Sequence, residues 1–306
     1  MRAFTLDSFE TAPGYRDDLP VPSAGADELL VRVRASSVNP ADAAIASGML
    51  KGMAEYDFPV TLGRDFAGVV EDSGPDVGEY GPGDAVYGFV LHANPTVHDG
   101  SWADYAVIPE GSVSRKPESV AIATAGAAPV AGLVAVAAFD ALELAPGDVV
   151  FVIGAAGGVG SFFVQLAASA GAHVIAPALP EDAEYLHDLG VSEIIERDSD
   201  VAAEVRERFP EGVDGLLDLV SFTPDTSVLK EGGRLASPLG AAGEGPGRVN
   251  LMASGTTANL ERLGRLLETG ALRVHIQDTY PLEQAGTALQ RLTGSHTQGK
   301  VALAIA

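Results

Sequence analysis

The glycine-rich stretch that follows an apolar run is the feature that most constrains the fold of this chain. Residues 149–160 read VVFVIGAAGGVG, and a helical pattern and a second apolar run come after them. Ala155, Gly157 and Gly160 have the spacing of the fingerprint that joins a strand to a helix in dinucleotide-binding βαβ units. Small residues there allow a tight turn, a close approach to a pyrophosphate and close packing of the helix on the strand.

A helix that begins at such a turn presents free N–H groups and the positive end of its dipole, which together bind phosphate. The turn can also serve only to pack a helix closely on a sheet, without a ligand. We predict that it binds a dinucleotide through Ala155, Ala156, Gly157, Gly158, Val159 and Gly160.

Helical and β-type patterns alternate from about residue 119 onward. Strands that are apolar throughout and interleaved with helices indicate a parallel sheet covered on both faces. The sequence therefore predicts an α/β fold with a Rossmann, doubly wound parallel sheet. The predicted helices cover residues 121–142, 161–170, 181–189, 201–209 and 259–269.

The first part of the chain has a different pattern. Short alternating runs are separated by Gly- and Pro-rich turns, which is typical of a barrel-like or folded β domain. We predict a β-rich domain over residues 1–121 and a dinucleotide-binding domain over residues 122–272. Because residues 273–306 again have β character, we expect them to complete the first domain.

The residues after the second predicted strand leave the choice between NAD and NADP open. NAD-binding domains usually carry an acidic residue there for the ribose, whereas NADP needs a cation for the 2′-phosphate. The strand ends in the apolar residues 176–178, and Glu181 and Asp182 follow. The nearest candidate cation is Arg197, at the end of the third strand; it could equally be a solvated surface residue.

The composition excludes several classes of site and partner. There is no cysteine, so disulfides, Cys-ligated zinc and a thiol nucleophile are impossible. A net charge of −23 repels phosphate backbones and anionic lipid surfaces, so we expect neither nucleic acid nor a membrane as partner. No signal-peptide or membrane-spanning pattern is found, which favours a cytoplasmic protein.

Several further stretches occur in the order and at about the spacing of one family. They include SSVNPADAAIASG, FPVTLGRDFAGVVEDSG, GSWADYAVIPE, VDGLLDLV, GGRLASPLG and SHTQGKVALAI. In these stretches the chain resembles the zinc-independent quinone oxidoreductase branch of the medium-chain dehydrogenase/reductase superfamily, which includes zeta-crystallin-like proteins. The resemblance implies a GroES-like β-rich catalytic domain, a Rossmann domain, a cleft at their junction, and NADPH as the usual hydride donor.

The resemblance also implies candidate site residues. Asn39 and Asp42 match an N-P-x-D motif that lines the nicotinamide end of the cleft in this branch, and they are the candidate catalytic residues. Asn39 could donate a hydrogen bond to a developing enolate or to the cofactor, and Asp42 could orient either Asn39 or a water. Alternatively, Asn39 could be only a turn residue before Pro40, and Asp42 could be only the N-cap of the following helix. The further candidate cofactor contacts are Val134, Leu239 and Gly240.

Zinc-dependent relatives hold their metal with a Cys and a His-Glu pair. Here Asn39 and the segment 63–65 stand in the matching regions, and His92 and His98 have no recognisable partner ligands. We therefore predict no metal site, and without a Lewis acid the chemistry points away from alcohol oxidation.

The predicted function is NADPH-dependent transfer of hydride to quinones or related conjugated carbonyls. Two alternatives remain open: a 2-enoyl or enone reductase of the same superfamily, and a catalytically idle nucleotide-binding or sensor protein. The branch commonly forms homodimers through the edge strand of the Rossmann sheet. We expect that edge near Leu272–Asp278 or in the segment before it.

Overall fold

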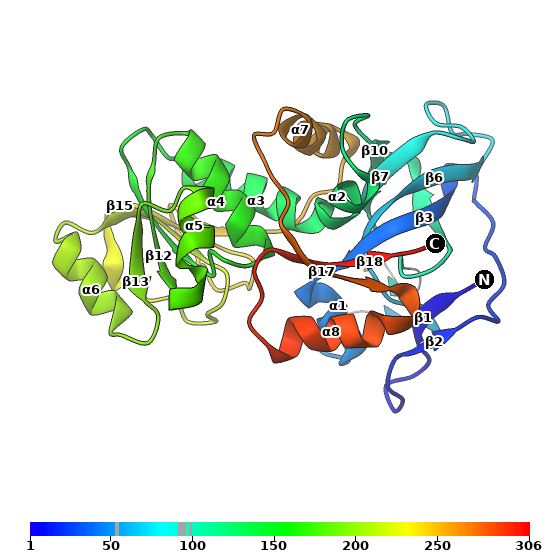
Figure 1. Cartoon of the computed structure of the whole chain (residues 1–306), viewed down its shortest axis with the longest axis horizontal. Coiled ribbons are helices and arrows are strands. Elements are labelled where there is room, and N and C mark those ends of the chain that lie inside the picture. The colour runs from blue at the N-terminus through cyan, green and yellow to red at the C-terminus, as the bar shows by residue number, and fades with distance from the viewer. Residues whose placement is uncertain (53–54, 91–95, 98–99) are drawn as a thin grey trace. The chain divides into compact units, whose positions relative to one another are not determined.

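The computed structural model describes residues 1–52, 55–90, 96–97 and 100–306, and these form two compact units (Figure 1). The first unit consists of Met1–Val130, Gly255–Glu268 and Val274–Ala306. The second consists of Ala131–Ser254 and Thr269–Arg273. His92 and His98, considered above as metal ligands, lie outside the described residues.

The first unit is built on a seven-stranded sheet with β3 (Glu28–Val38) near its centre. β3 pairs antiparallel with β6 (Asp65–Ser73), β9 (Tyr105–Pro109) and β18 (Lys300–Ala304). The C-terminal strand β18 thus joins a sheet that is otherwise built largely from the first 115 residues. The remaining strands are β7 (Ala85–Phe89), β10 (Val113–Arg115) and β17 (Ile276–Pro281).

Smaller elements complete this unit. Three short strands form a separate sheet: β1 (Ala3–Leu6), β2 (Gly14–Arg16) and β5 (Val60–Thr61). β4 (Glu55–Tyr56) pairs with β8 (Thr96–Val97). The helices are α1 (Pro40–Ala46), α2 (Ile122–Ala127), α7 (Thr257–Glu268) and α8 (Ala285–Gly294). α8 was not predicted, although its sequence places apolar residues at helical spacing against the core: Ala285, Ala288, Leu289 and Leu292.

The second unit contains the predicted parallel sheet, which has six strands. Its order is β13-β12-β11-β14-β15-β16, and every pair is parallel. The strands are β11 (Val149–Ile153), β12 (His173–Ala178), β13 (Glu193–Glu196), β14 (Val213–Asp218), β15 (Leu229–Ser237) and β16 (Arg248–Asn250). From β11 the chain first adds β12 and β13 on one side of the sheet. It then returns to the other side of β11 and adds β14, β15 and β16. The strand order therefore reverses between β11 and β14, and ligands bind at such a switch point in open α/β sheets.

The helices of this unit follow the predicted pattern, with one difference. They are α3 (Pro129–Leu142), α4 (Gly158–Ser169), α5 (Ala183–Leu189) and α6 (Val201–Arg208). The first two residues of α3, Pro129 and Val130, belong to the first unit. The single helix expected over residues 121–142 is two helices, α2 and α3. Pro129 opens α3 because proline has no N–H to continue the helix before it and suits a first helical position.

The division into units differs from the expected boundaries at 121 and 273. Residues 122–130 and α7 belong to the first unit. α7 is held there by the Tyr87 hydroxyl, which donates to the carbonyl of Leu260. A side chain at Gly264 would also meet the same hydroxyl at 2.9 Å, so the helix lies close against β7. The periodicity of α7 shows that it is a helix but does not say which core it covers.

The edges of the parallel sheet are β13 and β16. The prediction that Leu272–Asp278 supplies this edge was wrong, because β17 pairs with β18 in the sheet of the first unit. The alternation of the sequence identified a strand but could not identify its partner. In the part of the chain that the structure describes, no helix has the length and apolar character needed to cross a membrane.

Candidate active site

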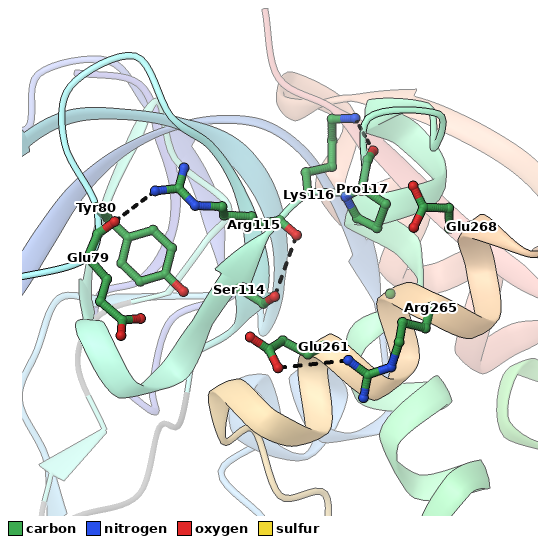
Figure 2. Close-up of a pocket in the computed structure, with 10 residues that line it drawn as sticks. Glu79, Tyr80, Ser114, Arg115, Lys116, Pro117, Glu261, Arg265 and Glu268 are labelled. Atoms are coloured by element: carbon green, nitrogen blue, oxygen red, sulfur yellow. Dashed lines mark hydrogen bonds and ion pairs between the residues drawn. The ribbon is translucent and has the colours of Figure 1, made fainter.

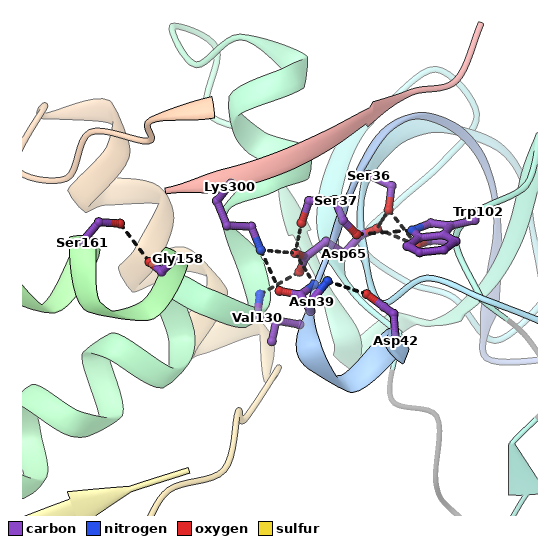
Figure 3. A network of polar contacts seen from close by, with 11 residues as sticks. Ser36, Ser37, Asn39, Asp42, Asp65, Trp102, Val130, Gly158, Ser161 and Lys300 are labelled. Carbon is purple, nitrogen blue, oxygen red and sulfur yellow. Dashed lines mark hydrogen bonds and ion pairs between the residues drawn. The ribbon is translucent and has the colours of Figure 1, made fainter. Parts of the chain in front are cut away.

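Three strands of the first unit bring together polar side chains that lie far apart in the sequence (Figure 3). Asn39 follows the last residue of β3, Asp65 opens β6 and Lys300 opens β18. Because β3 pairs with both other strands, with Val38 opposite Val301, the three polar residues meet at one end of the sheet.

The Asp65 carboxylate is the hub of this network. It is fully buried, and its Oδ2 accepts a hydrogen bond from Asn39 Nδ2 at 2.9 Å and another from the Ser37 hydroxyl. Its Oδ1 accepts from the backbone N–H of Val130 at 2.7 Å, in the first turn of α3. Lys300 Nζ lies 3.4 Å from Oδ2 and supplies the compensating charge. A buried carboxylate needs such partners, since desolvation penalises an unpaired charge by several kcal/mol.

The residue two positions before Asp65 in this loop, Gly63, is set by packing. Gly63 has φ +98°, and a Cβ there would lie 2.2 Å from Cδ1 of the buried Trp102. The Trp102 indole N–H in turn donates to the carbonyl of Ser37 at 3.2 Å. A glycine is therefore required for the loop to deliver Asp65 to this position.

Asn39 is contacted on both sides of its side-chain amide. Its Oδ1 accepts from Lys300 Nζ at 2.6 Å, while its Nδ2 donates to Asp65. Asn39 and Lys300 are 3% and 4% exposed. The expected partner Asp42 accepts from the backbone N–H of Asn39 at 2.7 Å, so it orients the backbone of Asn39 rather than the amide.

Asp42 is fully buried at the start of α1. Burial raises the pKa of its carboxyl to about 7, although the charge of Arg64 opposes the rise. Burial likewise lowers the pKa of the Arg64 guanidinium, against the attraction of Asp42. Within the described residues, Asp42 Oδ1 and Arg64 Nε have no hydrogen-bond partner. Asp42 is therefore a carboxyl that can hold or release a proton near neutral pH.

The network does not fit zinc. Among the described residues, no three His, Cys, Asp or Glu side chains form a group that could hold a metal ion. The positive charge beside Asn39 and Asp65 is already supplied by the ammonium of Lys300, which would repel a divalent cation. The oxygen atoms of Asn39 and Asp65 at this position therefore already bind the ammonium of Lys300.

The second candidate site is the glycine turn between β11 and α4. Gly154 has φ +88°, and a Cβ on Gly160 would lie 2.2 Å from the carbonyl oxygen of Gly154, so both positions require glycine. A Cβ on Gly157 would meet only that oxygen, at 3.5 Å, and otherwise open space. Ala155 and Ala156 are buried, whereas Gly157, Gly158 and Val159 are partly exposed at the start of α4. The turn thus leaves room for an anionic group beside free helix N–H groups.

The other predicted cofactor contacts lie around the same sheet. Leu239 and Gly240 follow the end of β15, with Leu239 half-buried and Gly240 exposed and open to solvent at its Cβ position. Val134, within α3, is only 6% exposed and offers little surface to a ligand. Arg197 is exposed, and its backbone N–H donates to the carbonyl of Ala178 at 3.1 Å. The third strand therefore ends beside the second, as the prediction for Arg197 requires.

A hollow of about 270 Å³ in the first unit is lined by several cations, and their charges are taken up by neighbouring groups (Figure 2). Arg115 pairs with Asp84 at 2.7 Å, and Arg265 lies 3.8 Å from Glu261. Lys116 Nζ donates to the carbonyls of Pro117 and Val120. The cations of this hollow are thus used by neighbouring groups, and it is a poor site for an anion.

Sequence reasoning missed the roles of Asp65, Arg64 and Lys300. A signal was present, because Asp65 and Lys300 are charged residues that open otherwise apolar strands, DFAGVV and KVALA. Such residues are rarely buried unless they are paired. The partner of each could not be found from the sequence, since 235 positions separate them.

Comparison with known proteins agrees with this architecture. Residues 25–118 match the alcohol dehydrogenase GroES-like domain family, and residues 189–303 match the zinc-binding dehydrogenase family. The chain is 30% identical to an NADPH-dependent alkenal/one oxidoreductase of Arabidopsis thaliana over 288 residues, covering 92% of this chain and 73% of the relative. It is 28% identical to a chloroplast envelope quinone oxidoreductase homolog of the same plant, with 92% and 91% covered.

The structure is also similar to that of the quinone oxidoreductase from Coxiella burnetii. The TM-score is 0.89 at 29% sequence identity, with 100% of this chain and 99% of the other covered. The chain belongs to the quinone oxidoreductase branch of the medium-chain dehydrogenase/reductase superfamily. It is therefore an oxidoreductase by family, with a GroES-like unit and a Rossmann unit.

The pKa of Asp42 leads to a testable change of stability with pH. Because this pKa is about 7 in the folded protein and 3.8 for an ordinary Asp, the folded state retains a proton that the unfolded chain has released. The stability contributed by Asp42 is complete below about pH 4 and is lost as the pH rises through 7. The free energy of unfolding of the wild type, minus that of Asp42→Asn, should therefore decrease between about pH 4 and pH 7 and level off above pH 7.

Urea unfolding of the two proteins across this range measures the difference. The matched control is Asp17→Asn, at an exposed carboxyl. A difference between wild type and Asp42→Asn that stays constant with pH would show that Asp42 keeps an ordinary pKa.

Proposed function

We propose that this chain is an NADPH-dependent reductase that transfers hydride to quinones and related conjugated carbonyls without a metal ion. The observation that carries the proposal is the Asn39–Asp65–Lys300 network, which provides a fixed hydrogen-bond donor where relatives of the superfamily hold zinc. The relatives named as quinone and alkenal/one oxidoreductases support the substrate class.

The glycine turn fits a dinucleotide. The open space at Gly157, the free N–H groups at the start of α4 and the switch point between β11 and β14 are the features that hold a pyrophosphate in such sheets. When bound, a reduced nicotinamide supplies the hydride. Leu239 and Gly240, after β15, would lie at the same carboxyl edge of the sheet as the turn.

The residues of the first unit act on the substrate. Addition of hydride to a quinone or enone places negative charge on the carbonyl oxygen, and the amide of Asn39 is a donor suited to that oxygen. A proton must then be taken up to give the quinol or the saturated carbonyl. Asp42, whose pKa is about 7 and which accepts from the backbone N–H of Asn39, is the candidate proton donor, and solvent can also protonate a quinol.

The direct test is an assay of NADPH and NADH oxidation with a panel of small quinones and 2-enones, with and without a strong chelator. We expect turnover of quinones that survives chelation and no stoichiometric zinc by elemental analysis. Turnover of enones alone would favour the enone reductase alternative. Cofactor binding without turnover would overturn the proposal in favour of an idle nucleotide-binding protein, and a tightly bound zinc would overturn the metal-free mechanism.

Replacement of Gly157 by Val tests the glycine turn. The new Cβ would meet only the carbonyl oxygen of Gly154, at 3.5 Å, and the side chain would occupy the space that a pyrophosphate needs. We expect the fold to survive, by thermal unfolding, while calorimetry shows a loss of dinucleotide affinity of about 100-fold or more, as for loss of several phosphate contacts. Gly14→Val, on β2 of the first unit, is the control, because its Cβ position is open and its φ is not positive. Unchanged affinity in Gly157→Val would mean that the turn only packs the helix.

We propose that NADPH is preferred over NADH and that Arg197 carries the preference. The backbone N–H of Arg197 donates to the carbonyl of Ala178, the last residue of β12, so Arg197 lies beside the end of that strand. Of the two acidic residues that follow the strand, Asp182 is buried and Glu181 is exposed. A charge-assisted contact between Arg and phosphate contributes about 1.5–3 kcal/mol. Arg197→Ala should therefore weaken NADPH binding by about 10- to 100-fold and leave NADH binding nearly unchanged.

Calorimetric titration of both cofactors into both proteins measures this difference, with Arg206→Ala on α6 as a surface control. Equal losses for NADPH and NADH, or a preference of the wild type for NADH, would contradict the assignment. Glu181 would then be the ribose ligand to test.

We further propose a homodimer that forms through the outer strand β16, in a cytoplasmic protein. An exposed edge strand has unpaired N–H and C=O groups, and a two-fold dimer is the commonest closed arrangement that pairs them. The cysteine-free composition suits a cytoplasmic location. Light scattering at micromolar concentration should give the mass of two chains of 31.3 kDa; a monomeric mass would contradict the dimer.

A further inference from the structure

The amide of Asn39 can take only one orientation in this structure. Its oxygen faces the ammonium of Lys300 at 2.6 Å, and its nitrogen faces the carboxylate of Asp65 at 2.9 Å. An ammonium only donates hydrogen bonds, and an ionised carboxylate only accepts them. An amide rotated by 180° would therefore set N–H against N–H and oxygen against oxygen, so the two charged neighbours exclude it.

The two charged neighbours are themselves held in place. Asp65 also accepts hydrogen bonds from the Ser37 hydroxyl and the Val130 N–H, and Lys300 is the first residue of β18, whose next residue pairs with Val38. Asp65 is fully buried and Lys300 is 4% exposed, so water has little access to replace either contact. The orientation of the Asn39 amide is thus set by groups anchored in three strands and a helix.

One hydrogen-bond donor of this amide is left over. The nitrogen carries two N–H bonds, of which one donates to Asp65. No acceptor for the second is found among the described residues. The positive charge at the oxygen end polarises the amide, which strengthens donation from its nitrogen.

We infer that Lys300 and Asp65 are positioning residues that hold the Asn39 amide with its second N–H directed at the substrate oxygen. This role rests on the proposed reduction of conjugated carbonyls. A donor that is already oriented stabilises the charge that develops on that oxygen without the cost of reorganisation. Lys300 and Asp65 act through Asn39 and touch neither substrate nor cofactor.

A double-mutant cycle tests whether Lys300 acts through Asn39. The variants are Lys300→Met, Asn39→Ala and the two combined, assayed for quinone reduction. Loss of an oriented donor lowers kcat by about 100-fold, so Asn39→Ala should lose this much and Lys300→Met about 10-fold or more, each with the KM for the cofactor unchanged. In the Asn39→Ala background, Lys300→Met should have little further effect.

Two further variants separate positioning from stability. Lys300→Gln keeps an N–H donor for Asn39 Oδ1 but no charge, and it should retain more activity than Lys300→Met. The matched control is Lys230→Met, which removes a lysine that pairs with Asp214 at an exposed position of the second unit. It should change kcat by less than about 2-fold, as expected for an exposed ion pair.

A readout without turnover makes the inference independent of the proposed function. With ¹⁵N-labelled asparagine, the side-chain amide of Asn39 is assigned by its loss in Asn39→Ala. We expect two resolved proton signals that exchange slowly with water in the wild type, and shifted signals that exchange at least about 10-fold faster in Lys300→Met. Lys230→Met should leave them unchanged.

The outcomes are distinct. If the wild type reduces no quinone or enone, the proposed function fails, and the amide signals still decide whether Lys300 holds Asn39. If the wild type is active but the losses of Lys300→Met and Asn39→Ala multiply in the double variant, Lys300 does not act through Asn39 and the inference is overturned. Unchanged Asn39 amide signals in Lys300→Met overturn it as well.

Discussion

The buried carboxylate of Asp65 is the interaction on which the candidate active site depends. It joins the end of β3 through Ser37 and Asn39, the start of β18 through Lys300, and the first turn of α3 through Val130. A buried charge is tolerated only when its hydrogen bonds and its counter-charge are complete, so removal of one partner penalises the others. The network therefore couples the last strand of the chain to the loop that carries Asn39.

The same network underlies the proposal that the chain reacts without zinc. A metal ion would polarise a carbonyl directly, whereas in the proposed reaction the cation is Lys300, which would act through the amide of Asn39. Such an arrangement provides a hydrogen bond rather than a Lewis acid. It suits a substrate whose developing charge is already spread over a conjugated system, as in a quinone or an enone.

The dinucleotide side of the protein relies on steric features instead of charge. Gly154 is required by its φ of +88° and Gly160 by a backbone contact within the turn, whereas Gly157 leaves space that the fold does not use. Phosphate would be held there by backbone N–H groups and the helix dipole in a protein whose net charge is −23. Against that background, we propose that one exposed cation, Arg197, would influence the choice of dinucleotide.

The sequence by itself determined the parallel sheet, the turn at Gly157 and the family, because these depend on local periodicity and on residues adjacent in the chain. It also placed Asn39 and Asp42 correctly as neighbours, since three positions separate them. It could not show that Lys300 meets Asn39 across 261 positions, or that β17 joins β18 rather than the parallel sheet. Those pairings are decided by which apolar faces and strand edges find each other in the folded chain. A period of two along a strand indicates a buried face and carries no information about its partner.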